Sequence, residues 1–298
     1  MAARVGFSDS QFAFLIIIPL LFFNIVVVGY PLAYSFYESF FETHTITQSR
    51  TFVGFGLYLE ALKDPNVTRS LSVTAIFVAI VTLLSSVLGL AMALIMNENF
   101  FGRTFLRTIL ILPWAVSEFV GAVTWRFVLA DTYGALNGFL YQLGLIQTYQ
   151  FWLNESQAIV WLAISFVWHF APLGAYFFLS ALQTVPEDLY NQSKADGAGP
   201  LKRFGYITFP YLRYSILIVL VLATLEAFRV WDTIFVITYG GPGKSTEVLT
   251  FRIYRELFDF GNLGYACAIS YLLLSIAIIV TIIYFMLLTK RKRGAVGI

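Results

Sequence analysis

The stretch VPEDLYNQSKADGAGPLKRFGYITFP, residues 185–210, is a polar segment in an otherwise strongly apolar chain. Its pattern predicts two short helices joined by a turn. Pro186 suits a first helical turn, and Glu187 and Asp188 follow where a helix N-terminus favours negative charge. Gly197 predicts the stop, because glycine readily adopts the left-handed geometry that ends helices. The segment is therefore expected to be ordered and not a slack linker.

The second half of this segment predicts another short helix. Pro200 can open it, and Leu201, Phe204 and Ile207 then recur every three residues. Pro210 is expected to close it before the next apolar run. Two roles fit such a segment. It is either a rigid docking element exposed to the cytoplasm, or a helix pair on the membrane surface that only connects two spans.

The composition indicates a membrane protein. Of 298 residues, 59% are apolar and 12% charged, and the mean hydropathy is +0.78. A soluble domain has about 25% charged residues, so this chain could not cover a water-facing surface. The single cysteine, Cys267, excludes an internal disulfide, and the isolated His44 and His169 form no metal-binding pattern. Nothing suggests nucleic-acid binding. The expected class is an all-α polytopic membrane protein.

Six apolar runs are long enough to cross a bilayer, which takes about 20 residues. The runs lie near residues 12–34, 71–95, 108–129, 158–183, 214–238 and 266–288. The first exceeds the apolar core of a signal peptide, about 7–15 residues, so it is expected to stay as a span. No interval between the runs fits a soluble domain, and residues 1–298 are predicted to form a single transmembrane domain.

The basic residues predict the orientation of the spans. With the N-terminus inside, the inner segments hold eleven Lys and Arg residues, and the outer loops hold seven. The cluster at 290–293, directly after the last span, sharpens this bias. Both termini and residues 185–210 are therefore expected in the cytoplasm. The outer stretch 131–152 mixes Gly and Asn with aromatic residues, which predicts a short interfacial helix.

The segment that begins at Pro186 resembles the EAA loop of permease subunits in binding-protein-dependent ABC importers. The likeness rests on Asp196-Gly197-Ala198 and on the downstream Ile207-Thr208-x-Pro210. More narrowly, the chain resembles the maltose-type (MalF-like) carbohydrate permease subunits. Three other stretches agree in the same order: RTFLRTILILPWAVSEFVGAVTWRFVL (103–129), VWDTIFVITYGGPGKSTEVL (230–249) and FGNLGYACAIS (260–270). The resemblance covers nearly the whole chain.

This resemblance implies that the loop is a coupling helix lodged in a groove of a cytoplasmic ATPase. Closing of the ATPase around ATP would switch the cavity from inward-facing to outward-facing. The residues implied at the ATPase are Glu187, Asp188, Leu189, Tyr190, Asn191, Gln192, Ser193, Asp196, Gly197 and Ala198. One departure is that the family usually has Glu-Ala-Ala after the Leu-Tyr pair, where this chain has Asn191-Gln192-Ser193. A charge that could face the ATPase is thereby lost.

Few ionisable residues fall within the predicted spans, where they are costly and usually line an interior or a water-filled cavity. They are Glu118, Arg126, His169, Glu226, Arg229 and Asp232. At about 1.5 Å per helical residue, three of them are expected near mid-depth: Glu118, His169 and Glu226.

The resemblance also implies solute-contacting positions. They fall on Phe166, His169, Phe170 and Leu173 in the fourth span, and on Ala223, Glu226, Ala227 and Val230 in the fifth, with Arg229 a further candidate. Each set of four has the i, i+3, i+4, i+7 spacing of one helix face. A structural alternative stays open, in which Glu226, Arg229 and Asp232 form an ion-pair ladder along one helix. In that alternative His169 and Glu118 make contacts between helices.

The string GPGKST, residues 241–246, ends like a phosphate-binding loop. The pattern requires a glycine five residues before Gly243, and that position is Thr238. No ATP binding is therefore expected on this chain, and ATP and Mg are expected on separate ATPase subunits. In the family this outer loop faces the solute-binding protein, with Gly240, Gly241 and Pro242 shaping its turn.

The resemblance thus implies a permease of the type I ABC importer fold in the cell (plasma or inner) membrane, without catalytic residues or a metal. The implied solute is a di- or oligosaccharide like maltose or trehalose, or a related polyol or glycerol-phosphate compound. The implied partners are a second, related permease subunit in a heterodimer, two ATPase subunits and an extracytoplasmic solute-binding protein. The alternatives are an ion-driven secondary carrier, which would work without an ATPase, and a membrane-embedded transferase, which would need a clustered acidic or histidine site near one membrane face.

Overall fold

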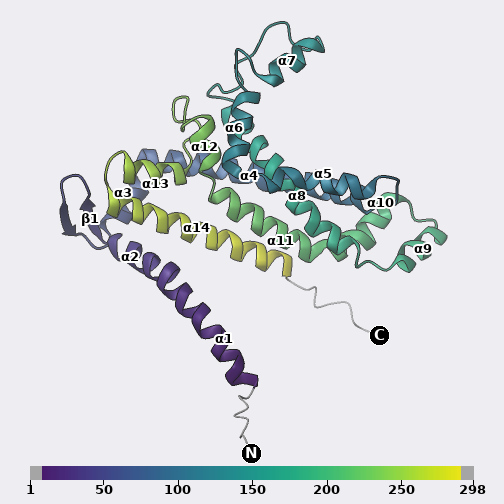
Figure 1. The fold of residues 1–298 in the computed structure, drawn as a ribbon, viewed down its shortest axis with the longest axis horizontal. Coiled ribbons are helices and arrows are strands. Elements are labelled where there is room, and N and C mark those ends of the chain that lie inside the picture. The colour runs from purple at the N-terminus through teal and green to yellow at the C-terminus, as the bar shows by residue number, and fades with distance from the viewer. Residues whose placement is uncertain (1–8, 290–298) are drawn as a thin grey trace, which may run out of the picture. The chain divides into compact units, whose positions relative to one another are not determined.

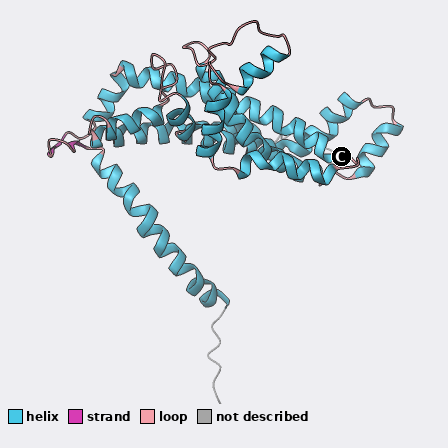
Figure 2. Ribbon diagram, turned by 45° about the horizontal axis from the view of Figure 1, so that its top comes forward, coloured by secondary structure: helices cyan, strands magenta, loops and turns pink. Residues whose placement is uncertain are grey.

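The computed structural model describes residues 9–289, so the 290–293 cluster and Arg4, one of the eleven inner Lys and Arg residues counted for the orientation, lie outside the described residues. Within 9–289 the regular structure is helical except for one two-stranded hairpin, the magenta ribbon of Figure 2 (Figures 1 and 2). The chain divides into two compact units. The first unit is Met1–Asp64 with Ile253–Leu272, and the second is Pro65–Arg252 with Leu273–Ile298.

The first unit opens with an uninterrupted helix made of α1 (Asp9–Asn24), the π-helical turn η1 (Ile25–Gly29) and α2 (Tyr30–Glu38). Pro31 follows η1 by two residues. A proline ring inside a helix clashes with the carbonyl four residues back, here that of Val27. Because Val27 lies within the wider π turn, the helix can pass this proline without ending.

A hairpin that the sequence did not predict follows this helix. Strands β1 (Phe41–His44) and β2 (Ser49–Phe52) pair antiparallel. Glu38, at the end of α2, is 2% exposed and pairs with Arg50 Nη2 at 2.9 Å, while Thr43 Oγ1 donates to its other oxygen at 3.0 Å. A buried carboxylate needs such partners, and both of them come from the hairpin.

The rest of the first unit is α3 (Gly56–Lys63) together with parts of α13 (Leu249–Phe258) and α14 (Leu263–Thr289). Gly264 joins α14 to the hairpin. A Cβ atom on this residue would collide with the carbonyl oxygen of Phe41, so no larger residue fits there.

The second unit is built around α4 (Pro65–Asn97), α8 (Ala158–Leu182) and α11 (Phe209–Phe228), which pack on one another (Figure 1). Their core consists of Ala93, Met96, Ala175, Phe178, Leu179, Leu182, Leu212 and Val219. Where α4 contacts α8 at Gly89, a Cβ atom on this glycine would meet backbone atoms of Ala171 and Ala175, each at 3.2 Å. Small residues allow such close contact between membrane helices.

The other helices of the second unit are short. They are α5 (Arg103–Ala115), α6 (Glu118–Val128), α7 (Ala135–Gln142), α9 (Glu187–Ala195), α10 (Pro200–Arg203), the π-helical η2 (Phe204–Thr208) and α12 (Asp232–Ile237). The α7 helix lies within the outer stretch 131–152, where a short helix was predicted.

The expected all-α polytopic class is confirmed. Among the described residues, five helices are long and apolar enough to cross a membrane: Phe14–Glu38, Pro65–Asn97, Ala158–Leu182, Pro200–Phe228 and Leu263–Leu287. A sixth crossing is reached if α5 and α6, which meet at a bend of 95°, are counted as one broken span. That pair, Arg103–Ala115 with Glu118–Val128, lies over the apolar run predicted near residues 108–129.

Candidate functional site

The loop at residues 185–210 contains the predicted helix and turn. The α9 helix ends at Ala195, and Gly197 follows with a φ of +74°. The amide of Ala198 donates to the carbonyl of Ser193 at 2.9 Å, and that of Gly197 to the carbonyl of Lys194 at 3.0 Å. These two bonds form a Schellman motif, which needs a left-handed residue at this position. The stop predicted at Gly197 is therefore confirmed.

The α9 helix is attached to the rest of the second unit along one side. The hydroxyl of Tyr190 lies 2.9 Å from that of Thr208, at the end of η2. Leu189, Tyr190, Ser193 and Ala198 are half-buried, and the exposed members of the predicted coupling set are Glu187, Asp188, Asn191, Gln192, Asp196 and Gly197. The helix thus presents a polar surface while its opposite side is held.

The helix predicted to close at Pro210 does not end there. Residues Pro200–Phe228 run without interruption through α10, η2 and α11. Pro210 follows the π turn η2 by two residues, the same spacing as Pro31 after η1. The wider turn contains the carbonyl of Tyr206, with which the proline ring would otherwise clash. The loop is therefore continuous with the fifth span.

The third span is interrupted next to two of the predicted polar residues, Glu118 and His169. α5 ends at Ala115 and α6 begins at Glu118, a favourable place for an acidic side chain because it is a helix N-terminus. His169, on α8, donates from Nδ1 to the carbonyl of Pro113 at 2.9 Å. This hydrogen bond satisfies a carbonyl left over at the end of α5. His169 thus makes the interhelical contact that the structural alternative expected, and its solute role stays a prediction.

Glu118 lies beside a small hollow, with room for about one water molecule, between α6, α8 and α12. Its carboxylate oxygen Oε1 is buried without a hydrogen-bond partner among the described residues. The hollow is lined by Glu118, Gly121, Ala122, Trp125, Ser165, Phe166, Trp168, His169 and Thr233. Sequence reasoning missed the tryptophans and Thr233, because their convergence depends on the break in the third span.

The structural alternative of an ion-pair ladder along the fifth span is wrong for Asp232. Arg229 Nη1 lies 3.2 Å from Glu226 Oε1. The α11 helix ends at Phe228, and Trp231, whose φ of −139° is not helical, separates it from α12, which Asp232 begins. Asp232 therefore lies at the N-terminus of a new helix, where its charge is favoured, and not one turn above Arg229.

Most of the predicted solute-contacting residues are buried within this chain. They are Phe166, Phe170, Ala223, Ala227 and Val230, whereas His169, Leu173 and Glu226 are partly exposed and Arg229 is exposed. Phe166 packs edge-on against Phe77 of α4, with ring centroids 5.7 Å apart. At this level the exposed or partly exposed residues are Leu225 and Glu226 of α11 and Arg229, directly after it. The solute role of the whole set stays a prediction.

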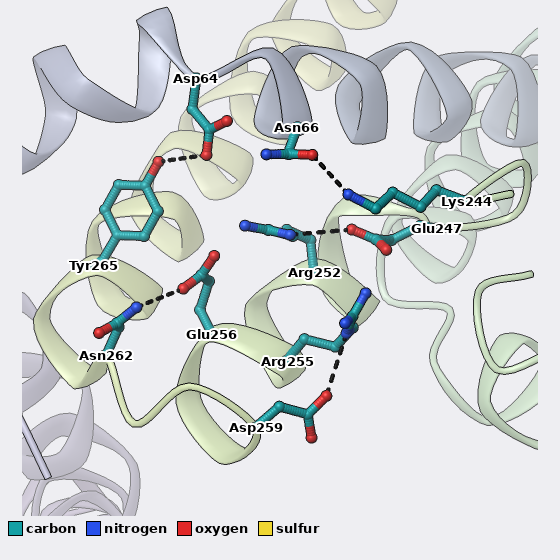
Figure 3. Close-up of polar contacts among 10 residues, drawn as sticks. All are labelled: Asp64, Asn66, Lys244, Glu247, Arg252, Arg255, Glu256, Asp259, Asn262 and Tyr265. Carbon is teal, nitrogen blue, oxygen red and sulfur yellow. Dashed lines mark hydrogen bonds and ion pairs between the residues drawn. The ribbon is translucent and has the colours of Figure 1, made fainter. Parts of the chain in front are cut away.

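The loop around GPGKST is held closely to the start of α4. Arg69 Nη2 donates to the carbonyl of Gly243 at 2.6 Å. Lys244 Nζ donates to Asn66 Oδ1 at 2.8 Å, as Figure 3 shows. Thr246 donates to the carbonyl of Gly241 at 2.8 Å. The lysine and threonine that suggested a phosphate site are therefore engaged in holding the loop.

The turn of this loop depends on glycine at Gly240. Its φ is +80°, and a Cβ there would approach the ring of Phe251 to 2.8 Å. This geometry agrees with a turn shaped by Gly240, Gly241 and Pro242. Contact with a solute-binding protein stays a prediction for these three residues.

Buried charges between residues 247 and 256 were not foreseen. In the second unit, Glu247 and Arg252 are 2% and 8% exposed and pair at 3.5 Å (Figure 3). In the first unit, Asn262 Nδ2 donates to Glu256, which is 2% exposed, at 2.8 Å. Tyr265 donates to Asp64 at 3.1 Å. The sequence signal was α13 itself, a short helix rich in both charged and apolar residues.

The outer stretch that contains α7 is organised by one buried amide. Asn137 is 0% exposed, and its Nδ2 donates to the carbonyl of Gln150 at 3.0 Å. Its Oδ1 accepts from the Gln150 amide and from Trp152 Nε1, each at 3.0 Å. These bonds close the segment into a loop that encloses the asparagine, so the stretch is an ordered part of the second unit.

Comparison with known proteins gives the class. Residues 85–293 match the profile of the family described as binding-protein-dependent transport system inner membrane component. The chain is 33% identical over 285 residues to the trehalose/maltose transport system permease protein MalF of Thermococcus litoralis, covering 95% of this chain and 96% of that one. It is 30% identical over 291 residues to the sn-glycerol-3-phosphate transport system permease protein UgpA of Brucella abortus, covering 97% and 98%.

A solved structure agrees on the fold. The bacterial alginate ABC transporter, in complex with an alginate pentasaccharide-bound periplasmic protein, superposes with a TM-score of 0.77 at 19% identity, covering 92% of both chains. The chain belongs to the family of binding-protein-dependent transport system inner membrane components. It is a membrane permease with the type I ABC importer fold.

Proposed function

We propose that this chain is the non-catalytic permease subunit of an ATP-driven importer for a di- or oligosaccharide like maltose or trehalose, or for a related polyol or glycerol-phosphate compound. The observation that carries the proposal is the likeness to the trehalose/maltose permease at 33% identity over 95% of the chain. The likeness to the glycerol-3-phosphate permease supports including glycerol-phosphate compounds among the proposed solutes. Both termini lie in the cytoplasm under this proposal.

The proposed assembly has this chain beside a second, related permease subunit, with two ATPase subunits on the cytoplasmic side and a solute-binding protein outside. The alginate transporter solved with its periplasmic protein supports the last partner by analogy. ATP and Mg bind to the ATPase subunits and not to this chain. The coupling loop would move the spans, because α9 is short, ends in a closed turn at Gly197 and is fastened to Thr208.

Reconstitution in liposomes tests this function. Solute uptake is expected only when the second permease, the ATPase subunits, the binding protein and ATP on the cytoplasmic side are all present. Uptake by this chain alone, driven by an ion gradient without nucleotide, would instead establish a secondary carrier. Release of a transferred glycosyl or lipid product would establish a membrane transferase.

Within this proposal, Glu226 faces the path of the solute. Its side chain is 37% exposed, where most of the other predicted contacts are buried. A hydrogen bond to a charged group contributes about 1.5–3 kcal/mol, so Glu226→Ala should lower uptake about tenfold or more. The measurement is initial uptake in liposomes, with the melting temperature of the purified protein beside it.

Arg229→Ala is the comparison variant, because it breaks the same ion pair from the other side, although Arg229 is itself a further solute candidate. A solute contact by Glu226 predicts a clearly larger loss of uptake for Glu226→Ala than for Arg229→Ala, at equal melting temperatures. Equal losses of uptake and of thermal stability in the two variants would show that the pair only holds the end of α11.

A further inference from the structure

The short helix α3 (Gly56–Lys63) of the first unit has three different sides. One side is buried, with Leu57 at 5% and Ala61 at 0% exposure. A second side is charged and exposed, with Glu60 and Lys63. A soluble helix needs only these two sides, because its apolar face meets the core and its polar face meets water.

The third side is apolar and uncovered. Phe55, directly before the helix, and Leu59 and Leu62 within it are 68%, 58% and 64% exposed. Their spacing of i, i+4 and i+7 places them in one stripe along the helix. At about 100° per residue, this stripe lies between the buried side and the charged side. The helix therefore meets three environments: protein, water and an apolar phase.

The same unit contains a candidate membrane span that the described part of this chain leaves uncovered. In Phe14–Glu38, the most apolar window has none of its residues buried inside the chain. Its end at Glu38 is fixed to the hairpin by Arg50. Phe55 packs edge-on against Phe40, just after that end, with ring centroids 5.3 Å apart. The apolar stripe of α3 is thus attached to the boundary where the span leaves the membrane.

We propose that α3 is an interfacial helix whose stripe of Phe55, Leu59 and Leu62 inserts into the phospholipid of the leaflet at the Glu38 end of the first span. Amphipathic helices in this position bury their apolar face at the boundary of headgroups and acyl chains and keep the charged face in water. Lys63, in the last turn of α3, can place its aliphatic stem along the same boundary with its ammonium group in water. The helix then fixes the depth and tilt of the first span.

Site-directed fluorescence tests this placement. The chain has one cysteine, Cys267, so a Cys267→Ala background allows a single environment-sensitive label at Leu59→Cys. Glu60→Cys is the matched control, one residue away on the charged side. The full-length chain, with the subunits that co-purify with it, is reconstituted in phosphatidylcholine vesicles that carry nitroxide lipids. Cys267 is buried, so it can also be kept, with the labelled parent chain as background.

The label at position 59 should lose its emission to nitroxide lipid and resist aqueous iodide, and the label at position 60 should do the reverse. Equal quenching of both labels by iodide would overturn the proposal, since the stripe would then face water. Protection of position 59 from both quenchers that ends when the other subunits are removed would also overturn it, because a protein partner would then cover the stripe.

Discussion

A Gly89→Leu substitution should leave little folded protein in the membrane. Gly89 lies where α4 crosses α8, and even a Cβ atom would meet the Ala171 carbonyl oxygen and the Ala175 nitrogen at 3.2 Å. Backbone atoms of a packed helix cannot rotate away as a flexible side chain can, so the two helices would have to separate. Overpacking of a core costs about 1–3 kcal/mol and occasionally more, and a leucine adds three further carbon atoms. The loss should exceed that of any other substitution considered above.

The measurement is the yield of monodisperse protein after detergent extraction, together with its melting temperature. Gly205→Leu is the control, because Gly205 is also helical, within η2, but has open space around it. The control should keep the parent yield. A Gly89→Leu protein with the parent melting temperature would show that α4 and α8 do not pack closely at this point.

The long apolar helices could be predicted from the sequence because hydrophobicity over about 20 residues is a sufficient condition for a span. Their interruptions could not. Pro113 precedes the break in the third span, Pro210 follows a π turn that preserves its helix, and the end of α11 at Phe228 contains no proline. A proline therefore marks a possible irregularity, and the surrounding packing decides whether the helix ends, widens or continues.

The spacing predicted which residues share a helix face, but not whether that face packs inside the chain or is exposed. The set Ala223, Glu226, Ala227 and Val230 does share a face by spacing, yet three of its members are buried in this chain. Small residues on a membrane helix favour close packing against a neighbouring helix. The two alanines thus indicated a contact inside the chain. The ionisable Glu226 indicated the part of this face that stays partly exposed.

The sequence predicted the geometry of the turn at Gly197 more reliably than the functional role of the loop that contains it. Gly197 was predicted as a helix stop from its type and position alone, and it has the left-handed φ that this requires. The docking role of residues 187–198 depends on a partner subunit, so the geometry of this chain alone does not establish it. A substitution that changes the turn and little else can test whether the docking role depends on the turn.

Gly197→Val should abolish most coupling of ATP hydrolysis to solute uptake while the protein still inserts and folds. The φ of +74° disfavours any residue with a Cβ atom, and a β-branched residue most of all. A left-handed conformation costs a non-glycine residue about 1–2 kcal/mol, which is enough to change a local equilibrium by a factor of about 5–30. The Schellman bonds would be lost and α9 would no longer end in a fixed turn, so motion of an ATPase would be absorbed locally.

The expected result is ATP hydrolysis near the parent rate with a severalfold lower uptake per ATP, measured in the same liposomes. Gly197→Asn should retain most uptake, because asparagine tolerates the left-handed region. Gly199→Ala is the positional control, since Gly199 has an ordinary φ of −69° and open space around its Cβ position. If uptake per ATP is far lower in Gly197→Val than in Gly197→Asn, and Gly197→Asn is close to the parent, the left-handed geometry of the turn is what matters and not glycine itself. If Gly197→Val supported uptake per ATP at the parent level, α9 would be a surface connection between spans and the coupling proposal would be wrong.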